Sequence, residues 1–299
     1  MSDSLPIPLT SPLTPAQQAS LINLVRRAAK AEIMPRFRNL GHADVSAKSS
    51  RYDLVTEADT GAEAILARGI QRMFPHALVV GEEAASADDT LRDKIGEAEL
   101  AFIVDPLDGT WNFAHGLAVF GVIVAVTRFG KPVLGLLYDP VMDDWIIADE
   151  AHPARLARNL GAERPLQMSR GGALDEMSGF IHLYLMPKEG QAEMAATFPD
   201  FARTQVLRCS CHEYRTLAQG GMDFCLSGMM TPWDHAAGVL ICQQAGGYVA
   251  MLDGSDYNAA VREGYLLTAP NKDSWQRLRD RFAFLLDGPD TAEPVVTET

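Results

Sequence analysis

Positive charge, cysteine and long apolar runs are all scarce in this chain of 299 residues. Lysine and arginine together number 26 against 39 aspartates and glutamates, a formal net charge of −13 that disfavours nucleic acid as a partner. The N-terminus lacks a basic region followed by an apolar core, and no apolar run approaches the roughly 18 residues needed to span a bilayer. We therefore expect a cytoplasmic protein without a nucleic-acid partner or a membrane segment.

Four cysteines are too few for a disulfide framework in a chain of this length. Cys209 and Cys211, followed by His212, have the spacing of half a metal site, but the second spaced pair that a zinc site needs is missing. No Asn-x-Ser/Thr acceptor for glycosylation occurs either. The cysteines are therefore expected to be reduced structural thiols.

Length and composition indicate a globular protein of one large domain or two joined domains, since 47% of the residues are hydrophobic and 22% are charged. Residues 1–13 and 287–299 are rich in proline and in polar or acidic residues, and we expect them to be flexible tails around a domain of residues 14–286. Antiparallel strands are predicted over residues 120–150, whereas strands and helices alternate after residue 175. A boundary between two halves is therefore expected near residues 150–175.

Helix signals are strongest near the N-terminus. Thr14, followed by Pro15 and then by Gln17, predicts a helix that continues to about Arg36. A second helix is expected over residues 59–73, and two short apolar strands, near 77–80 and 100–104, each run directly into acidic residues. Later helices are predicted near residues 189–198, 212–219, 234–245 and 272–286.

The stretch from Ile103 to Thr110 is the most informative, because an apolar strand leads there into Asp105 and Asp108. Such a pattern places hard oxygen ligands at the C-terminal end of a strand, the usual ligand-binding edge of a layered α/β sheet. Gly109 allows the backbone to approach a phosphate, with its N–H and that of Thr110 directed outward. A solvent-exposed turn would have the same pattern, so this motif does not decide the function alone.

Three further acidic clusters stand at the ends of predicted elements. Glu82 follows a strand, Asp59 lies where a helix begins, and Asp234 opens the helix that starts with the sequence WDHAAG. Asp234 alone would serve equally well as a helix N-cap. Four acidic clusters, each at an element end, are harder to explain as caps, and they favour a common site.

These motifs resemble those of the inositol monophosphatase family of Mg²⁺-dependent, lithium-sensitive phosphatases, in the family's order from about Lys48 to Asp234. The family's first signature, D-P-[IL]-D-G-T-x-N-F, stands here as DPLDGTWNF, and its second, W-D-x-A-A-G, stands as WDHAAG. The resemblance implies an α/β fold in five layers, the αβαβα sandwich of the inositol monophosphatase and fructose-1,6-bisphosphatase type. It also implies a homodimer.

The resemblance further implies two or three Mg²⁺ ions per active site and a small phosphomonoester as substrate. Carried over by position, the family's metal ligands are Glu82, Asp105, the carbonyl of Leu107, Asp108 and Asp234, with Asp105 bridging two ions. The implied catalytic residues are Asp59 and Thr110, which would activate the attacking water, together with Glu82. The implied contacts to substrate are Lys48, Asp108, Gly109, Thr110 and Asp234. Carboxylates select Mg²⁺, and metal-activated water needs no protein nucleophile.

The chain departs from the family's inositol-binding pattern in two places. Ser227 stands seven residues before Asp234, where members that hydrolyse inositol phosphate carry a glutamate that holds ring hydroxyls. In the segment 208–215, Ser210 and Glu213 are candidates for hydrogen bonds to a polyol or an amine, although Glu213 fits an ordinary helix start equally well. Substrates resembling inositol-1-phosphate are therefore expected among a broader set, the alternatives being fructose-1,6-bisphosphate, histidinol phosphate and a 3′-phosphoadenosine nucleotide.

Other functional classes fit less well. A phosphatase that forms an aspartyl-phosphate needs two aspartates two positions apart, whereas Asp105 and Asp108 are three apart. No G-x-x-x-x-G-K-[ST] sequence occurs, and His212-Glu213 lacks the second histidine of a zinc protease. A non-catalytic member of the fold that binds another protein would be marked by loss of a metal ligand. Because every expected ligand is present, an enzyme is favoured.

Overall fold

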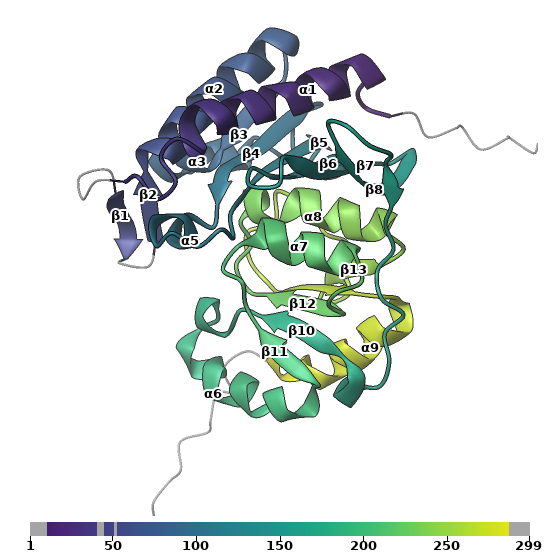
Figure 1. Cartoon of the computed structure of the whole chain (residues 1–299). Coiled ribbons are helices and arrows are strands. Elements are labelled where there is room, and N and C mark those ends of the chain that lie inside the picture. Colours follow the sequence, from purple (N-terminus) through teal and green to yellow (C-terminus); the bar gives the residue numbers. More distant parts are fainter. Residues whose placement is uncertain (1–10, 41–44, 51–52, 287–299) are drawn as a thin grey trace, which may run out of the picture.

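The computed structural model describes residues 11–40, 45–50 and 53–286, and of residues 45, 47–50 and 53 it describes the backbone alone. Its helices and sheets lie in five alternating layers (Figure 1). Helices α1 and α2 cover one face of a seven-stranded sheet, α7 and α8 lie between this sheet and a five-stranded sheet, and α9 covers the far face of the second sheet (Figure 1). The predicted αβαβα sandwich is confirmed.

Capping boxes begin both helices of the first layer. Helix α1 (Pro15–Ala28) starts after Thr14, whose side chain accepts a hydrogen bond from the Gln17 N–H, and the chain continues as a π-helical turn over Ala29–Ile33. Helix α2 (Glu57–Met73) starts after Thr56, which is paired in the same way with Asp59. The two predicted helices are confirmed, and the second cap also fixes a residue that was expected to be catalytic.

The seven-stranded sheet has the order β3-β4-β5-β6-β7-β8-β9, and β3 and β4 are its one parallel pair among the described residues. The antiparallel strands expected between residues 120 and 150 are therefore confirmed. The carboxyl ends of β3 and β4 meet at the same edge because the two strands are parallel. The strands are β3 (Leu78–Gly81), β4 (Ala101–Asp108), β5 (Gly121–Arg128), β6 (Lys131–Asp139), β7 (Asp144–Asp149), β8 (His152–Arg158) and β9 (Arg164–Pro165).

Strand β4 is longer than the expected strand, which ended near residue 104. It continues to Asp108, and its pairing with β5 is irregular between Asp105 and Asp108. Pro106 lies within this irregularity and has no N–H to donate to the sheet. The strand therefore carries both aspartates, rather than ending before them. Helix α5 (Thr110–Ala114) follows β4 directly. The chain passes from β3 to β4 through α3 (Glu82–Ala87) and α4 (Thr90–Asp93).

The five-stranded sheet has the order β11-β10-β12-β14-β13, with β10 parallel to both β11 and β12. The chain reaches it through residues 166–177, after β9, which lies close to the boundary expected near 150–175. The strands are β10 (Ser178–Ile181), β11 (Arg203–Gln205), β12 (Phe224–Ser227), β13 (Tyr248–Met251) and β14 (Leu266–Ala269). The remaining α-helices are α6 (Lys188–Ala196), α7 (Ser210–Ala218), α8 (Pro232–Gln244) and α9 (Lys272–Arg281), and β1 (Val45–Ser50) pairs antiparallel with β2 (Asp53–Thr56). Short 3-10 helices cover Leu174–Glu176, Leu183–Leu185, Phe198–Asp200 and Ala283–Leu285.

Small residues bring α8 close to its neighbours in the central layer. A Cβ atom at Gly238 would lie 2.1 Å from the ring of Tyr214 in α7, and one at Gly135 of β6 would lie 2.5 Å from the carbonyl oxygen of Ala237. The sequence AAG within WDHAAG is therefore explained by packing, since a larger side chain would push α8 away from the sheet. This packing sets where the first turn of α8, and with it Asp234, stands.

The described end of the predicted N-terminal tail is packed against the fold. Leu13 is 1% exposed, and the hydroxyl of Ser11 lies 2.8 Å from the carbonyl oxygen of Leu13 and 2.9 Å from Oδ2 of Asp149, two acceptors for its single proton. Ser11 and Leu13 are thus packed before the predicted helix begins, while residues 1–10 and 287–299 lie outside the part described. None of the helices within the described ranges combines the length and apolar character needed to cross a bilayer.

Candidate metal centre

Three carboxylates converge where β4 ends and α8 begins. Asp105, Asp108 and Asp234 each offer an oxygen such that the three atoms lie within 4.8 Å of one another. Asp105 and Asp108 are buried, and Asp234 is partly exposed in the first turn of α8, where it accepts a hydrogen bond from the hydroxyl of Thr231. The fold therefore unites two motifs that lie far apart in the sequence.

The acidic cluster is electrostatically costly without a cation. Burial raises the pKa of Asp108 to about 8, assisted by the nearby charge of Asp234. Burial likewise holds the pKa of Asp105 well above its usual range, together with the charges of Glu82, Asp108 and Asp234. A positive ion would offset this repulsion, and a donor set of oxygens alone suits a hard divalent cation such as Mg²⁺. The residues present therefore fit such an ion.

Asp108 is oriented by the start of α7. Its Oδ2 accepts a hydrogen bond from the backbone N–H of Cys211 and lies 3.2 Å from Sγ of Cys209. All four cysteines are buried and free, as expected. Cys209 and Cys211 thus hold Asp108, a candidate ligand, in place.

The chain turns sharply at Gly109, directly after Asp108. Gly109 has a φ of +86°, and a Cβ there would meet the carbonyl oxygen of Val119 at 2.8 Å.

The two residues expected to activate water are in direct contact. The Thr110 hydroxyl lies 2.9 Å from Oδ1 of Asp59 and 2.9 Å from the carbonyl oxygen of Leu107, so its single proton has two acceptors. The other oxygen of Asp59 accepts hydrogen bonds from the N–H (2.8 Å) and hydroxyl (2.6 Å) of Thr56. Burial raises the pKa of Asp59 to about 6, although the bonds from Thr56 act in the opposite direction.

Glu82 lies beside this group at the first position of α3, immediately after β3. It is the nearby charge that does most to raise the pKa of Asp105, after burial itself. The start of α3 is itself held by Glu63 of α2, which accepts hydrogen bonds from the backbone N–H groups of Glu83 (2.8 Å) and Ala84 (2.9 Å). Nothing in the sequence marks Glu63 as a functional residue, although it stands four residues after Asp59 on the same helix face.

The expected substrate contacts lie in different environments. Lys48 belongs to β1, and its side chain is outside the described residues. Ser210 opens α7 and is partly exposed. Glu213 is 1% exposed, and both of its oxygens have protein partners: Oε1 accepts from the N–H of Leu207 at 2.7 Å, and Oε2 lies 2.5 Å from Nε2 of His182. His182 was not identified from the sequence, where a lone histidine after a strand carries no signal.

An aromatic stack lies in the short helix that follows Gly109. Trp111, in α5, stacks on His115 with ring centroids 4.0 Å apart, and the guanidinium of Arg208 lies 4.2 Å from the Trp111 ring centroid. Arg208 has a left-handed backbone, with a φ of +55°. A positively charged group is therefore placed at the turn that leads into α7.

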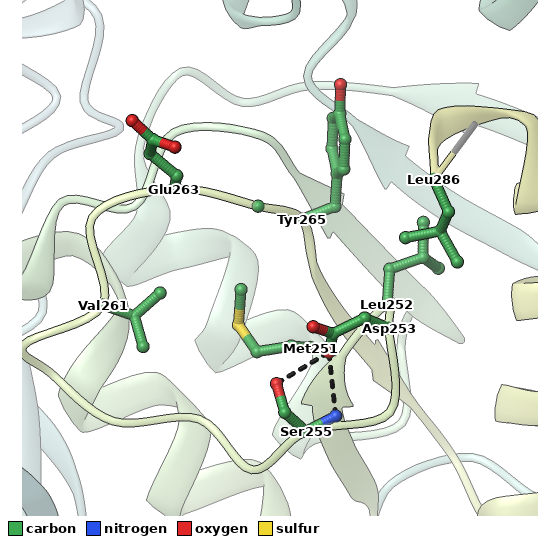
Figure 2. Close-up of a pocket in the computed structure, with 9 residues that line it drawn as sticks. Met251, Leu252, Asp253, Ser255, Val261, Glu263, Tyr265 and Leu286 are labelled. Atoms are coloured by element: carbon green, nitrogen blue, oxygen red, sulfur yellow. Dashed lines mark hydrogen bonds between the residues drawn. The ribbon is translucent and has the colours of Figure 1, made fainter. Parts of the chain in front are cut away.

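A separate pocket is found beside β13 and β14 (Figure 2). Met251 and Tyr265 line it, and Asp253 turns its carboxylate toward Ser255, whose N–H and hydroxyl both donate to Oδ1. Its lining contains none of the residues predicted for the site. The candidate site is therefore identified by its chemistry and not by the shape of this pocket.

Comparison with known proteins finds one family over nearly the whole described chain. A sequence model of the inositol monophosphatase family matches residues 16–283. The chain is 30% identical over 266 residues to an inositol-1-monophosphatase of Caulobacter vibrioides, a match that covers 87% of this chain and 98% of the relative. It is also 30% identical over 258 residues to a histidinol-phosphatase of Streptomyces coelicolor, covering 82% and 92%. Among solved structures, an inositol monophosphatase from Zymomonas mobilis has a TM-score of 0.73 at 23% identity, covering 91% of this chain and 100% of that one, which shows a shared fold.

Proposed function

Since the chain belongs to the inositol monophosphatase family and is a hydrolase of phosphoric monoesters, we propose that it releases inorganic phosphate from small polyol and sugar phosphates in a Mg²⁺-dependent reaction. The observation that carries this proposal is the convergence of Asp105, Asp108 and Asp234 within 4.8 Å, two of them buried. Buried carboxylates this close together are favourable only with a counter-charge, and oxygen donors suit Mg²⁺.

The proposed metal ligands are Glu82, Asp105, the carbonyl of Leu107, Asp108 and Asp234, for two or three ions. Mg²⁺ in such a site supplies a Lewis acid that activates water and neutralises charge on the phosphoryl group. Asp105 is proposed to bridge two ions because its carboxylate is close to those of Asp108 and Asp234, and the charge of Glu82 also acts on its pKa. The hydrogen bond from the N–H of Leu107 to its Oδ1, at 3.0 Å, holds this carboxylate in place.

The chain's own groups provide the path for the proton. We place the attacking water next to Thr110, whose hydroxyl takes a proton from it while passing its own to Oδ1 of Asp59, 2.9 Å away. A pKa of about 6 leaves Asp59 ionised at neutral pH and ready to accept. The water oxygen forms a bond to phosphorus as the bond between phosphorus and the ester oxygen breaks, and the departing alkoxide takes a proton from solvent. The products are an alcohol and inorganic phosphate.

Binding of the phosphate is assigned to the turn between β4 and α5. The amides of Gly109 and Thr110 are proposed to donate to phosphate oxygens, as is Lys48 through its ammonium group. Gly109 supports this assignment because its φ of +86° allows the tight turn from β4 into α5, where a Cβ would meet the carbonyl oxygen of Val119. Ser210, at the first position of α7, is proposed to contact the alcohol part of the substrate.

The alcohol specificity is proposed to be broad. Ser227 is 2% exposed and carries no carboxylate for ring hydroxyls, and the oxygens of Glu213 are already bonded to Leu207 and His182. A carboxylate that binds ring hydroxyls is worth about 1.5–3 kcal/mol, so its loss should weaken recognition of inositol by roughly ten- to a hundred-fold. Phosphate capture would be unaffected, so other phosphomonoesters should remain substrates.

A panel of phosphomonoesters with Mg²⁺ tests both the reaction and its breadth. We would measure kcat/KM for inositol-1-phosphate, fructose-1,6-bisphosphate, histidinol phosphate, a 3′-phosphoadenosine nucleotide and glycerol-2-phosphate. No phosphate release from any member would refute the proposed substrate class. A preference of more than about a hundred-fold for inositol-1-phosphate over every other member would show that Glu213 or another group restores inositol specificity.

We also propose that residues 14–286 form one catalytic domain of two halves, that it works as a homodimer, and that it is cytoplasmic. The packing of α7 and α8 between the two sheets supports the first point, since both halves contribute to the acidic cluster. Resemblance to the family supports the homodimer. The mass of the purified full chain in solution, measured by light scattering, would test it.

A further inference from the structure

A second group of ligand-type side chains lies at the parallel strands of the other sheet. Strand β10 pairs with β12 so that Phe180 is opposite Cys225 and Ile181 is opposite Leu226, and His182 N donates to the carbonyl of Leu226 at 3.3 Å. Side chains alternate along a strand, so His182 lies on the same face as Cys225. Glu213 reaches this face from α7.

His182, Glu213 and Cys225 each offer one ligand atom, and these three atoms lie within 4.8 Å of one another. All three residues are at least nine-tenths buried, with exposures of 9%, 1% and 3%. Asp108 and Asp234 are near enough to act electrostatically on His182, so the surroundings favour positive charge. The cluster is therefore close to the carboxylate centre without sharing a residue with it.

The hydrogen bonds of the cluster are incomplete. Nε2 of His182 lies 2.5 Å from Oε2 of Glu213, but its Nδ1 is buried without a hydrogen-bond partner among the described residues. The thiol of Cys225 likewise makes no hydrogen bond within the described part of the chain. A buried polar atom without a partner is unfavourable and is uncommon in folded proteins. The thiol of Cys225 is thus available for a ligand that the protein itself does not supply, and Nε2 of His182 is the nitrogen that faces Glu213.

The donor chemistry differs from that of the carboxylate centre. One nitrogen, one oxygen and one sulfur suit a borderline cation such as Zn²⁺ or Co²⁺, whereas Mg²⁺ prefers oxygen alone. Three protein ligands also leave a fourth position of a tetrahedral ion open. The N–H of Leu207, which donates to the other oxygen of Glu213, holds the carboxylate in the way that outer hydrogen bonds orient metal ligands.

We propose that His182, Glu213 and Cys225 form a second metal site, which binds a zinc-like divalent cation beside the magnesium centre. Binding replaces the contact between His182 and Glu213 with bonds to the ion, and the thiol of Cys225 gives up its proton to solvent as its sulfur becomes a ligand. No oxidation or reduction takes place. The proposal does not depend on the substrate or on the phosphatase reaction.

Cobalt binding to the full chain, saturated with Mg²⁺, is the test. Mg²⁺ occupies the oxygen ligands, and a thiolate bound to Co²⁺ gives a charge-transfer absorption band that oxygen ligands do not produce. We expect this band to develop with one equivalent of Co²⁺, and Zn²⁺ to abolish it. Absence of the band in the unmodified protein overturns the proposal, whatever the behaviour of any variant.

Matched variants locate the ion. Cys225→Ser should abolish the band, and His182→Ala should raise the Kd for Co²⁺ at least about tenfold. Cys209→Ser is the decisive control, because Cys209 lies 3.2 Å from Oδ2 of Asp108 and is the thiol that an ion in the carboxylate centre would meet. Cys242→Ser, a buried thiol of α8, controls for general loss of a cysteine.

Loss of the band in Cys209→Ser with its retention in Cys225→Ser would place the ion in the carboxylate centre and overturn the proposal. If Cys225→Ser does not fold, Glu213→Gln keeps nearly the same shape and gives the same decision. A weaker Kd for Co²⁺ in that variant supports the site, and an unchanged Kd contradicts it.

Discussion

The Oε2 atom of Glu63 accepts a hydrogen bond of 2.8 Å from the backbone N–H of Glu83, the residue after Glu82. This contact joins the middle of α2 to the start of α3. Asp59 stands one turn earlier on the same helix and touches Thr110. One helix therefore positions both the proposed proton acceptor and a proposed metal ligand.

Replacing Glu63 should weaken metal binding. In Glu63→Ala the first N–H groups of α3 lose their acceptor, so Glu82 is held less firmly. We expect the half-saturating Mg²⁺ concentration in the phosphatase assay to rise roughly tenfold or more, with kcat largely recovered at high Mg²⁺. Glu97→Ala, which changes an exposed glutamate, should leave the Mg²⁺ dependence unchanged. A drop in kcat that no Mg²⁺ concentration restores would argue against a positioning role.

Asp105→Asn should reduce turnover more than any other single substitution among the proposed ligands. A bridging carboxylate serves two ions, and an amide supplies less negative charge, so we expect a loss of more than about a hundred-fold. The variant should still fold, because it removes one like charge from a buried acidic cluster. Thermal unfolding in chelator checks this control. Turnover near that of the unmodified protein would exclude a bridging role.

Asp59 and Thr110 should act as a unit. If the hydroxyl relays the water's proton to the carboxylate 2.9 Å away, either residue alone is ineffective. The double variant Asp59→Ala with Thr110→Ala should then lose little more activity than the more damaging single variant. Measurement of kcat for the two single variants and the double variant decides the matter. Losses that multiply would point to two independent contributions.

Hydrolysis should require Mg²⁺ and should be inhibited by Ca²⁺ or lithium. The proposed site contains four carboxylates and no soft ligand, and its chemistry needs an ion that acidifies water. Phosphate release is measured after dialysis against excess chelator, and then with Mg²⁺ restored. Full activity in chelator would contradict the proposed mechanism.

The pair of Arg26 and Asp143 should make stability depend on pH. The Arg26 guanidinium donates two hydrogen bonds of 2.7 Å to Asp143, which holds the pKa of that carboxyl below its usual range of about 4. A carboxyl with a lowered pKa in the folded state contributes stability above its ordinary pKa and loses it as the pH falls through the folded value. Asp143→Asn should therefore lower Tm at pH 7 and have little effect in strong acid.

The size of this effect should be modest, at most about 1 kcal/mol, because the pair is partly exposed and screened by solvent. Asparagine tolerates the left-handed φ of +49° at this position, so the substitution should not strain the backbone. Asp175→Asn, at an exposed aspartate, serves as the control. An equal loss of Tm at pH 7 and in strong acid would mean that the charge is not responsible.

Local signals in the sequence were sufficient for most elements and for the acidic motifs. Capping at Thr14, the antiparallel texture after residue 120 and the two family signatures each depend on residues only a few positions apart. The predicted end of β4, near residue 104, is wrong by four residues. The apolar run predicts a strand that stops where the apolar residues stop. In the structure β4 continues as a buried strand through Asp105 to Asp108, past an irregularity at Pro106.

The sequence by itself determined which residues could carry the chemistry, namely carboxylates at the ends of elements and a Gly-Thr turn. Tertiary structure alone decided which of them meet. It unites Asp108 with Asp234, supports Asp108 through the N–H of Cys211, and occupies both oxygens of Glu213. It also creates the cluster of His182 with Cys225, which depends on the register of two parallel strands. The physical reason is that strand order, register and the close approach of α8 follow from packing between residues far apart in the chain, which no local pattern records.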